Sequence, residues 1–178
     1  VDDDVVSESN LQRQVLYTED EIGLSKALQA QKRLQALNHD IRINAYPTRL
    51  TKENAASLIA NYDIVVDGCD NFTTRYIIND ACAHWGRPYV YGAILAFEGQ
   101  VSVFNYQGGP DYRTLYPDEE EMLAMPAPFK GVLGVTPGVI GCMEANEVMK
   151  IIGGYGEVLS GKLWQIDLRT MESYTIML

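Results

Sequence analysis

The chain of 178 residues is long enough for one domain with a hydrophobic core and too short for two of ordinary size. Its net charge of -10 at pH 7 argues against a general binder of nucleic acid or anionic membranes, because phosphates attract clustered Lys and Arg. The three cysteines form no Cys-x-x-Cys pair, and no run of about 18 apolar residues could span a membrane. We therefore expect a cytoplasmic protein in which residues 1–178 form a single domain.

Helical and extended patterns alternate in the first part of the chain. The apolar stripe of residues 24–38 predicts a helix, and the alternation in residues 41–47 predicts a short strand that ends at a proline. Residues 51–62 read as a helix with Thr51 as its N-cap. The apolar run 62–68 is typical of a strand buried on both faces.

The same alternation continues in the middle of the chain. Residues 71–86 predict a helix that Asn71 caps and Gly86 ends, and residues 88–95 and 99–106 predict the next strands. Alternating helices and strands favour a parallel sheet with crossover helices.

Residues 107–130 lack clean periodicity. They hold four of the seven prolines and an acidic cluster at 118–121. A loop of this length in a compact domain is usually functional or disordered, and we expect an irregular segment here.

The C-terminal part returns to regular patterns. Residues 134–154 predict a long apolar helix with Pro137 in its first turn and Gly153 at its end. The last two apolar segments predict a closing hairpin. The fold class is therefore α/β: an incomplete Rossmann-like, mostly parallel sheet with crossover helices and a C-terminal antiparallel extension.

The segment VVDGCDN (65–71) places polar groups where a predicted strand meets a predicted helix. Ligands of open α/β sheets bind at this carboxyl edge, where Asp70 could hold Mg²⁺ beside a phosphate. The alternative is that Asp70 and Asn71 merely cap the helix.

Two basic residues follow the acidic start of the chain. Arg13 could grip a triphosphate with its guanidinium and Lys26 could act on it as a point charge, although a lone basic residue is more often solvated surface. Among the cysteines, Cys69 lies beside Asp70, which disfavours a thiolate, and Cys82 and Cys142 are expected in the core.

The segment NLQRQ and the motifs around it closely resemble the MoeB/ThiF family, which adenylates ubiquitin-like sulfur-carrier proteins and is related to the ubiquitin-activating enzymes. The resemblance covers nearly the whole chain and identifies it as the C-terminal two-thirds or more of an adenylation domain. Its pieces are Asp2, Asp4, Val6, SNLQRQ (9–14), GLSK (23–26) and DGCDN (67–71), followed by blocks at 92–106, 131–154 and 161–174.

The resemblance assigns roles to residues that match these motifs. It implies that Asp2 holds the ATP ribose, that Arg13 and Lys26 act at the triphosphate, and that Asp70 is associated with Mg²⁺ and catalysis. The implied catalytic residues are Arg13, Lys26 and Asp70. The implied nucleotide-binding residues are Asp2, Asp4, Asn10, Arg13, Gln14, Lys26 and Asn71.

The chain departs from the family pattern at three places. The strand–GxGGxG–helix loop of the family lies before the acidic segment, so the chain as given is expected to bind ATP poorly and to be inactive alone. Near residues 110–115, where many members carry the first Cys-x-x-Cys pair of a zinc site, Asp111 and Thr114 stand instead, so no zinc is expected. The cysteine that some members use covalently would fall near Ala127, where this sequence has none.

The resemblance implies ATP-dependent adenylation of the C-terminal Gly-Gly carboxylate of a ThiS- or MoaD-type carrier, for thiamin or molybdopterin biosynthesis. It also implies a homodimer that uses Mg²⁺. The alternative is a catalytically incomplete member that dimerises and binds a carrier without ATP. An NAD-dependent oxidoreductase shares the acidic strand end, but it does not explain NLQRQ, Lys26 and DGCDN together.

Overall fold

The computed structural model describes residues 1–126 and 131–178, which form two compact units, Val1–Leu50 and Thr51–Leu178. The single-domain expectation stays a prediction. Among the described residues, every helix is too short or too polar to cross a membrane.

The first unit is built around one helix and two short 3₁₀ turns. The elements are η1 (Glu8–Asn10), η2 (Glu19–Glu21) and α1 (Lys26–Leu37). The helix α1 confirms the prediction for residues 24–38, and Asn38 follows its last turn as expected. Val6 is 1% exposed, and its N–H donates to the carbonyl of Leu24 at 2.8 Å. This hydrogen bond holds the first residues against the segment that precedes α1.

The predicted strand at residues 41–47 is wrong, since this segment has no strand conformation in the structure. Two of its backbone carbonyls accept hydrogen bonds from outside the segment, but not from a neighbouring strand. Gln31 Nε2 donates to the carbonyl of Ile43 at 2.6 Å, and the N–H of Asp2 donates to the carbonyl of Tyr46 at 3.1 Å. An alternating pattern forms a strand only when a second strand lies beside it.

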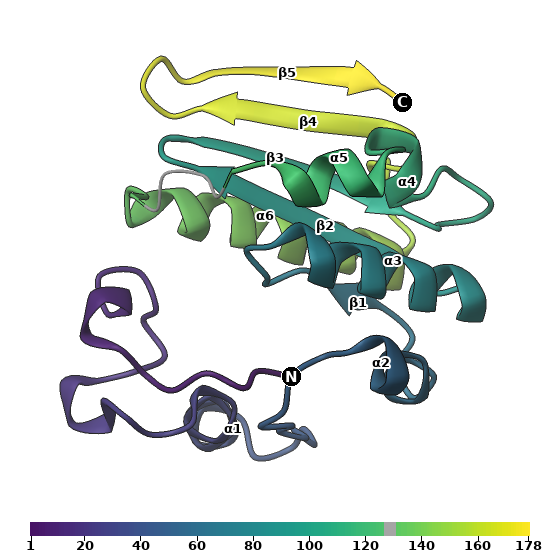
Figure 1. Cartoon of the computed structure of the whole chain (residues 1–178). Helices are drawn as coiled ribbons and strands as arrows, with labels where there is room; N and C mark the ends of the chain where they lie inside the picture. Colours follow the sequence, from purple (N-terminus) through teal and green to yellow (C-terminus); the bar gives the residue numbers. More distant parts are fainter. Residues whose placement is uncertain (127–130) are drawn as a thin grey trace. The chain divides into compact units, whose positions relative to one another are not determined.

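The second unit is a mixed sheet flanked by helices (Figure 1). The sheet order is β1-β2-β3-β4-β5, with β1 and β2 parallel and each later pair antiparallel. This arrangement confirms the α/β class and the antiparallel C-terminal extension. Its elements are α2 (Lys52–Ile59), β1 (Val65–Val66), α3 (Phe72–Trp85), β2 (Tyr89–Leu95), β3 (Glu98–Phe104), α4 (Tyr112–Leu115), α5 (Glu119–Ala124), α6 (Val135–Gly153), β4 (Lys162–Asp167) and β5 (Glu172–Met177).

The predicted helix ends are confirmed where a local cap sets them. Asn71 Oδ1 accepts the N–H of Thr74 at 2.8 Å and begins α3, and Gly86 ends it in the left-handed conformation with φ 60°. At the start of α2, Asn54 Oδ1 accepts the N–H of Thr51 at 2.9 Å as part of a capping box.

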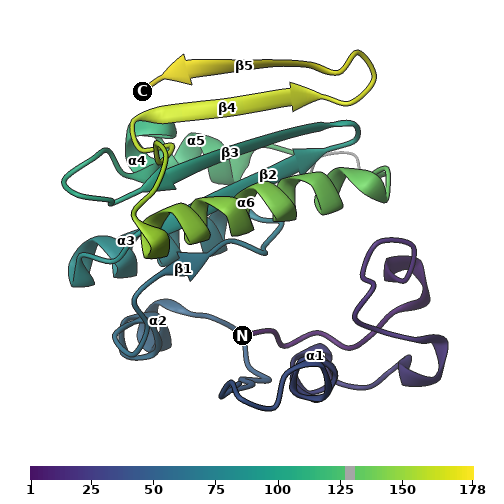
Figure 2. The same cartoon turned by 180° about the vertical axis from the view of Figure 1, so that it is seen from behind.

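Helices cover both faces of the sheet. The helices α3, α4 and α5 lie on one face and α6 lies on the other (Figures 1 and 2). The α6 face is packed so closely that Gly99 of β3 meets the side chain of Ile140. On the other face, buried aromatic rings from four elements stack edge to face or tilted; they are Tyr76, Tyr89, Tyr91, Phe104 and Tyr112.

Two expectations for the strands and loops of this unit need correction. The strand β1 has two residues instead of a long buried run, and Val66 is 48% exposed because β1 is the edge of the described sheet. Residues 107–130, expected to be irregular, contain α4 and α5. Each of these helices is too short to show periodicity, but an aspartate caps each: Asp111 accepts the N–H of Thr114 and Asp118 that of Glu121, both at 2.9 Å.

The last helix is also corrected in detail. The helix α6 includes Gly153, and the left-handed residue that ends it is Gly154, with φ 63°. Cys142 is exposed rather than in the core, whereas Cys82 is fully buried as expected. The buried stripe of α6 comprises Thr136, Ile140, Glu144 and Glu147, so polar side chains occupy positions where the pattern suggested apolar packing.

We expect Gly99→Ala to lower the free energy of unfolding by about 1–3 kcal/mol, the usual cost of overpacking a core. The added Cβ would collide with Cγ1 and Cδ1 of Ile140, which is 3% exposed. The matched control is Gly141→Ala on the exposed side of α6, where a Cβ meets nothing within 4 Å and helix propensity adds up to about 1 kcal/mol. Urea unfolding measures both variants, and equal changes would contradict the packing of α6 on β3.

Candidate functional site

A buried carboxylate organises the turn after β1. Both oxygens of Asp67, whose side chain is 0% exposed, accept hydrogen bonds. Its Oδ2 accepts Arg75 Nε and the Tyr89 hydroxyl, each at 2.9 Å. Its Oδ1 accepts the N–H of Cys69 at 2.8 Å, which closes the turn. Asp67 is therefore saturated by protein donors and serves to hold the turn in place.

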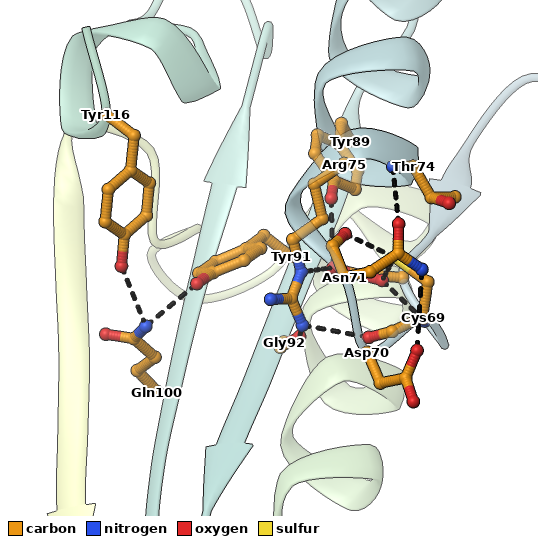
Figure 3. Close-up of polar contacts among 11 residues, drawn as sticks. Cys69, Asp70, Asn71, Thr74, Arg75, Tyr89, Tyr91, Gly92, Gln100 and Tyr116 are labelled. Carbon is orange, nitrogen blue, oxygen red and sulfur yellow. Dashed lines mark hydrogen bonds and ion pairs between the residues drawn. The ribbon is translucent and has the colours of Figure 1, made fainter. Parts of the chain in front are cut away.

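Arg75 connects this turn to the sheet (Figure 3). From the first turns of α3, its Nη2 donates to the carbonyl of Cys69 at 2.9 Å and to that of Gly92 at 3.2 Å. Its guanidinium also lies over the Tyr91 ring at 5.3 Å. Burial lowers the pKa of Arg75, but the neighbouring Asp67 charge outweighs burial and raises this pKa above its ordinary value. The pair is therefore a charged ion pair inside the protein.

The turn held by this pair exposes Asp70. Its Oδ1 has a contact with Asn71 Nδ2 at 3.4 Å, and the side chain faces solvent (Figure 3). Asn71, in contrast, is occupied as the N-cap of α3. The capping alternative thus holds for Asn71 and fails for Asp70, whose carboxylate is available as an oxygen ligand of the kind that Mg²⁺ prefers.

The thiol beside Asp70 is unsuited to nucleophilic chemistry. Cys69 Sγ donates to Asp67 Oδ1 at 2.9 Å. Burial raises the pKa of this thiol, and the Asp67 charge raises it further. Burial alone raises the pKa of the Cys82 thiol to about 12.

In the first unit, the structure brings together three of the residues predicted to bind nucleotide. Lys26 is 6% exposed, and its Nζ lies 3.1 Å from Oδ2 of Asp4. Asp2 Oδ1 accepts the N–H of Asp4 at 2.8 Å. The carboxylates of Asp2, Asp3 and Asp4 lie close enough to share a cation, although exposed acidic groups often cluster without one.

The NLQRQ motif of the same unit folds as consecutive turns. The carbonyl of Asn10 accepts the N–H groups of Arg13 and Gln14, at 3.0 and 2.9 Å. The Arg13 guanidinium donates to the carbonyl of Ser9 at 3.3 Å, and Gln14 Oε1 is buried without a partner among the described residues. Of the predicted residues in this unit, the described contacts join Asp2, Asp4 and Lys26, while Arg13 and Asn10 make local contacts.

Several residues that shape these groups were not predicted from the sequence. Tyr17 donates to the carbonyl of Lys26 at 3.2 Å, and burial, with the charges of Asp2 and Glu21, raises its pKa. Arg75 was also not predicted, and Asp67 appeared only as part of the DGCDN motif, without a role of its own. The sequence signal for this ion pair was an acidic residue, Asp67, at the end of an apolar run, followed by an arginine one turn into the next helix.

A mixed α/β sheet with helices on both faces and polar groups at the carboxyl end of a parallel strand places this chain in the Rossmann-like α/β class of folds. The whole chain, residues 1–178, matches the family described as "ThiF family", and the chain belongs to that family. The cysteine position expected near Ala127 lies outside the described residues.

Comparison with known proteins supports this membership. A "Sulfur carrier protein adenylyltransferase" of Thermus thermophilus is 49% identical over 173 residues, covering 94% of this chain and 64% of that protein. A "Probable molybdopterin-synthase adenylyltransferase" of Pyropia yezoensis is 47% identical over 165 residues, covering 92% of this chain and 44% of that protein. The chain thus spans 44 to 64% of the length of these two relatives.

The fold is also found in a solved structure. The crystal structure of E. coli MccB with ATP matches 99% of this chain and 54% of that chain, with a TM-score of 0.78 and 22% identity. At this identity the likeness supports the fold alone.

We expect Arg75→Met to lower the free energy of unfolding by about 3–5 kcal/mol, because it leaves the Asp67 charge buried without its partner. The control Arg169→Met removes the ion pairs of an exposed arginine with Asp167 and Glu98 and should change stability little. Denaturant unfolding at neutral pH compares the two. A loss for Arg75→Met no larger than that of the control would contradict a charged buried pair.

Proposed function

We propose that the protein containing this chain adenylates the C-terminal Gly-Gly carboxylate of a ubiquitin-like sulfur-carrier protein with ATP. Family membership and the names of the relatives support this reaction class. The observation that carries the proposal is the turn Asp67–Asn71, where a buried ion pair fixes the backbone and leaves Asp70 exposed at a strand end.

In the proposed reaction, an oxygen of the carrier carboxylate attacks the α-phosphorus of ATP. The bond between that phosphorus and the bridging oxygen breaks, so the products are an acyl-adenylate and pyrophosphate. Such a displacement needs positioning and charge stabilisation instead of a protein nucleophile. A chain whose cysteine beside Asp70 is held as a buried thiol suits this chemistry.

Each predicted site residue has a role in this proposal that follows from its side-chain chemistry. Asp70 would hold Mg²⁺, and a bound Mg²⁺ would neutralise phosphate charge. Arg13 and Lys26 would face the triphosphate, and Asp2 would accept from the ribose hydroxyls. Asn10, Gln14 and Asn71 would shape the site, and Asp4 would set the position of Lys26, since the two are paired.

Several finer assignments belong to the same proposal. We place the enzyme in the cytoplasm as a homodimer. The name of the Pyropia relative favours a MoaD-type carrier for molybdopterin biosynthesis over a ThiS-type carrier for thiamin.

We expect Asp70→Ala to reduce pyrophosphate release at least 100-fold with the complete protein, ATP, Mg²⁺ and a Gly-Gly carrier, a loss of about 2.7 kcal/mol in transition-state stabilisation. The fold should remain intact because Asp70 is exposed and caps nothing. Asp40→Ala, which removes another exposed carboxylate, should keep wild-type turnover.

Two outcomes would contradict the proposed reaction. Wild-type turnover in Asp70→Ala would remove the assigned role of that carboxylate. A wild-type protein that binds a carrier but neither binds ATP in calorimetry nor releases pyrophosphate would instead be a binding module.

We expect Arg13→Ala to weaken ATP binding about tenfold or more, because a guanidinium–phosphate contact is a charge-assisted hydrogen bond. Its present contact, the carbonyl of Ser9, is local and exposed, so stability should change little. Lys32→Ala on the exposed side of α1 is the matched control. Calorimetric titration with ATP separates them, and equal affinities would exclude Arg13 from the nucleotide site.

A further inference from the structure

Two glutamates on the buried side of α6 have different surroundings. Glu147 is 1% exposed and fully partnered, since Lys150 forms an ion pair with it and the N–H of Leu159 donates to its Oε2 at 2.9 Å. Glu144 is 7% exposed, and its Oε1 is buried with no hydrogen-bond partner among the described residues. A buried carboxyl oxygen without a partner in this position is not explained by packing alone.

The side chain of Glu144 lies against the backbone of Gly92. An ideal Cβ at Gly92 would lie 2.5 Å from Cδ of Glu144, so only glycine admits the carboxyl group here. The carbonyl of the same Gly92 accepts Arg75 Nη2 at 3.2 Å. Glu144 and the Asp67–Arg75 pair therefore meet the same residue of β2.

The charged groups that act on Glu144 are few. Within residues 1–126 and 131–178, Asp67 and Arg75 are the groups whose charges influence it. The residues that share the α6 face of β2 and β3 with Gly92, by strand alternation and register, cannot ionise; they are Val90, Ile94, Gly99, Val101 and Val103. On α6 itself, Glu147 and Lys150 are paired with each other, and Cys142 is exposed.

Protonation of Glu144 is favoured at neutral pH. Burial raises the pKa of its carboxyl to about 8, the Asp67 charge raises it further and Arg75 lowers it. Loss of the proton would leave a buried anion that repels Asp67 and competes with it for the guanidinium of Arg75.

We propose that Glu144 is a positioning residue that acts through Arg75: protonated, it leaves Arg75 on Asp67 and the Cys69 carbonyl, and deprotonated, it draws Arg75 away and loosens the turn that presents Asp70. This inference rests on the proposed function where it concerns turnover, and on the buried contacts alone where it concerns the turn. No other component is needed, because the step is the transfer of one proton to solvent.

The sign of the pH effect follows from the raised pKa. Between the ordinary carboxyl pKa, about 4.5, and about 8, the folded protein binds more protons at this group than the unfolded chain does. The contribution of Glu144 to stability is therefore full below this window and is lost as the pH rises through it. Glu144→Gln keeps the shape and cannot ionise, so this loss should disappear.

Hydrogen exchange of the complete protein tests the turn without any assay of activity. We expect the peptide covering residues 67–75 to exchange at least threefold faster in wild type than in Glu144→Gln at about pH 9, and equally at about pH 6. Comparison at one pH removes the intrinsic pH dependence of exchange. Glu120→Gln, an exposed carboxyl on α5, should behave as wild type. Glu144→Met provides a second neutral variant. Equal exchange of wild type and both neutral variants at about pH 9 overturns the inference.

The pH profile of pyrophosphate release provides the functional readout. With a pKa near 8, the protonated fraction falls about tenfold between pH 7 and pH 9. We expect the ratio of wild-type to Glu144→Gln turnover to fall by about that factor over this range, while the ratio to Glu120→Gln stays constant. A constant first ratio in an active enzyme overturns the effect on turnover. Absence of pyrophosphate release in all variants, with the exchange difference present, would reject the proposed function and keep the positioning role.

Discussion

The second unit depends on one buried ion pair, Asp67 with Arg75. Taking two charges out of water is costly, and such a pair is tolerated only when further donors and acceptors complete it. Here Tyr89 and the N–H of Cys69 complete the carboxylate, and the carbonyls of Cys69 and Gly92 complete the guanidinium. The pair thereby joins the end of β1, the start of α3 and the middle of β2. Its contribution lies in fixing one backbone conformation at the strand end more than in net stability.

Because of this ion pair, the nearby carboxylates of Asp67 and Asp70 have different surroundings. Asp67 is buried and saturated, so it has no capacity left for a ligand. Asp70, three residues later, is exposed and lightly contacted. Without Arg75, the Asp67 charge would stay buried without its ion-pair partner, and the carbonyl of Cys69 would lose its Arg75 donor. Because Asn71 caps α3 immediately afterwards, the position of Asp70 is fixed from both sides.

The sequence predicted those parts of the fold that local signals determine. The helix from Asn71 to Gly86 was predicted with its ends because the cap and the left-handed glycine act within one turn of chain. The segment 41–47 was not, because a strand needs a partner that lies elsewhere in the chain. The helices α4 and α5 were not predicted, because helices of four and six residues are too short to show a hydrophobic periodicity. Their N-caps, Asp111 and Asp118, were the only local signals of their starts.

In the candidate site, too, the residues positioned by local sequence could be predicted, and those positioned by tertiary contacts could not. The place of Asp70 and Asn71 between a strand and a helix could be predicted, because it is set by the local sequence. The contacts of Arg75 with Asp67 and with the Gly92 carbonyl of β2 could not, because they form only in the folded sheet. The two glutamates of α6 show the limit most clearly. They stand three residues apart on one helix face, and the local sequence offers a basic partner at i+3 only to Glu147, in Lys150. Glu147 meets Lys150 and the N–H of Leu159, whereas Glu144 meets the bare backbone of Gly92. The ionisation of a buried carboxyl is set by what faces it, so the chemistry of Glu144 follows from a glycine on another element.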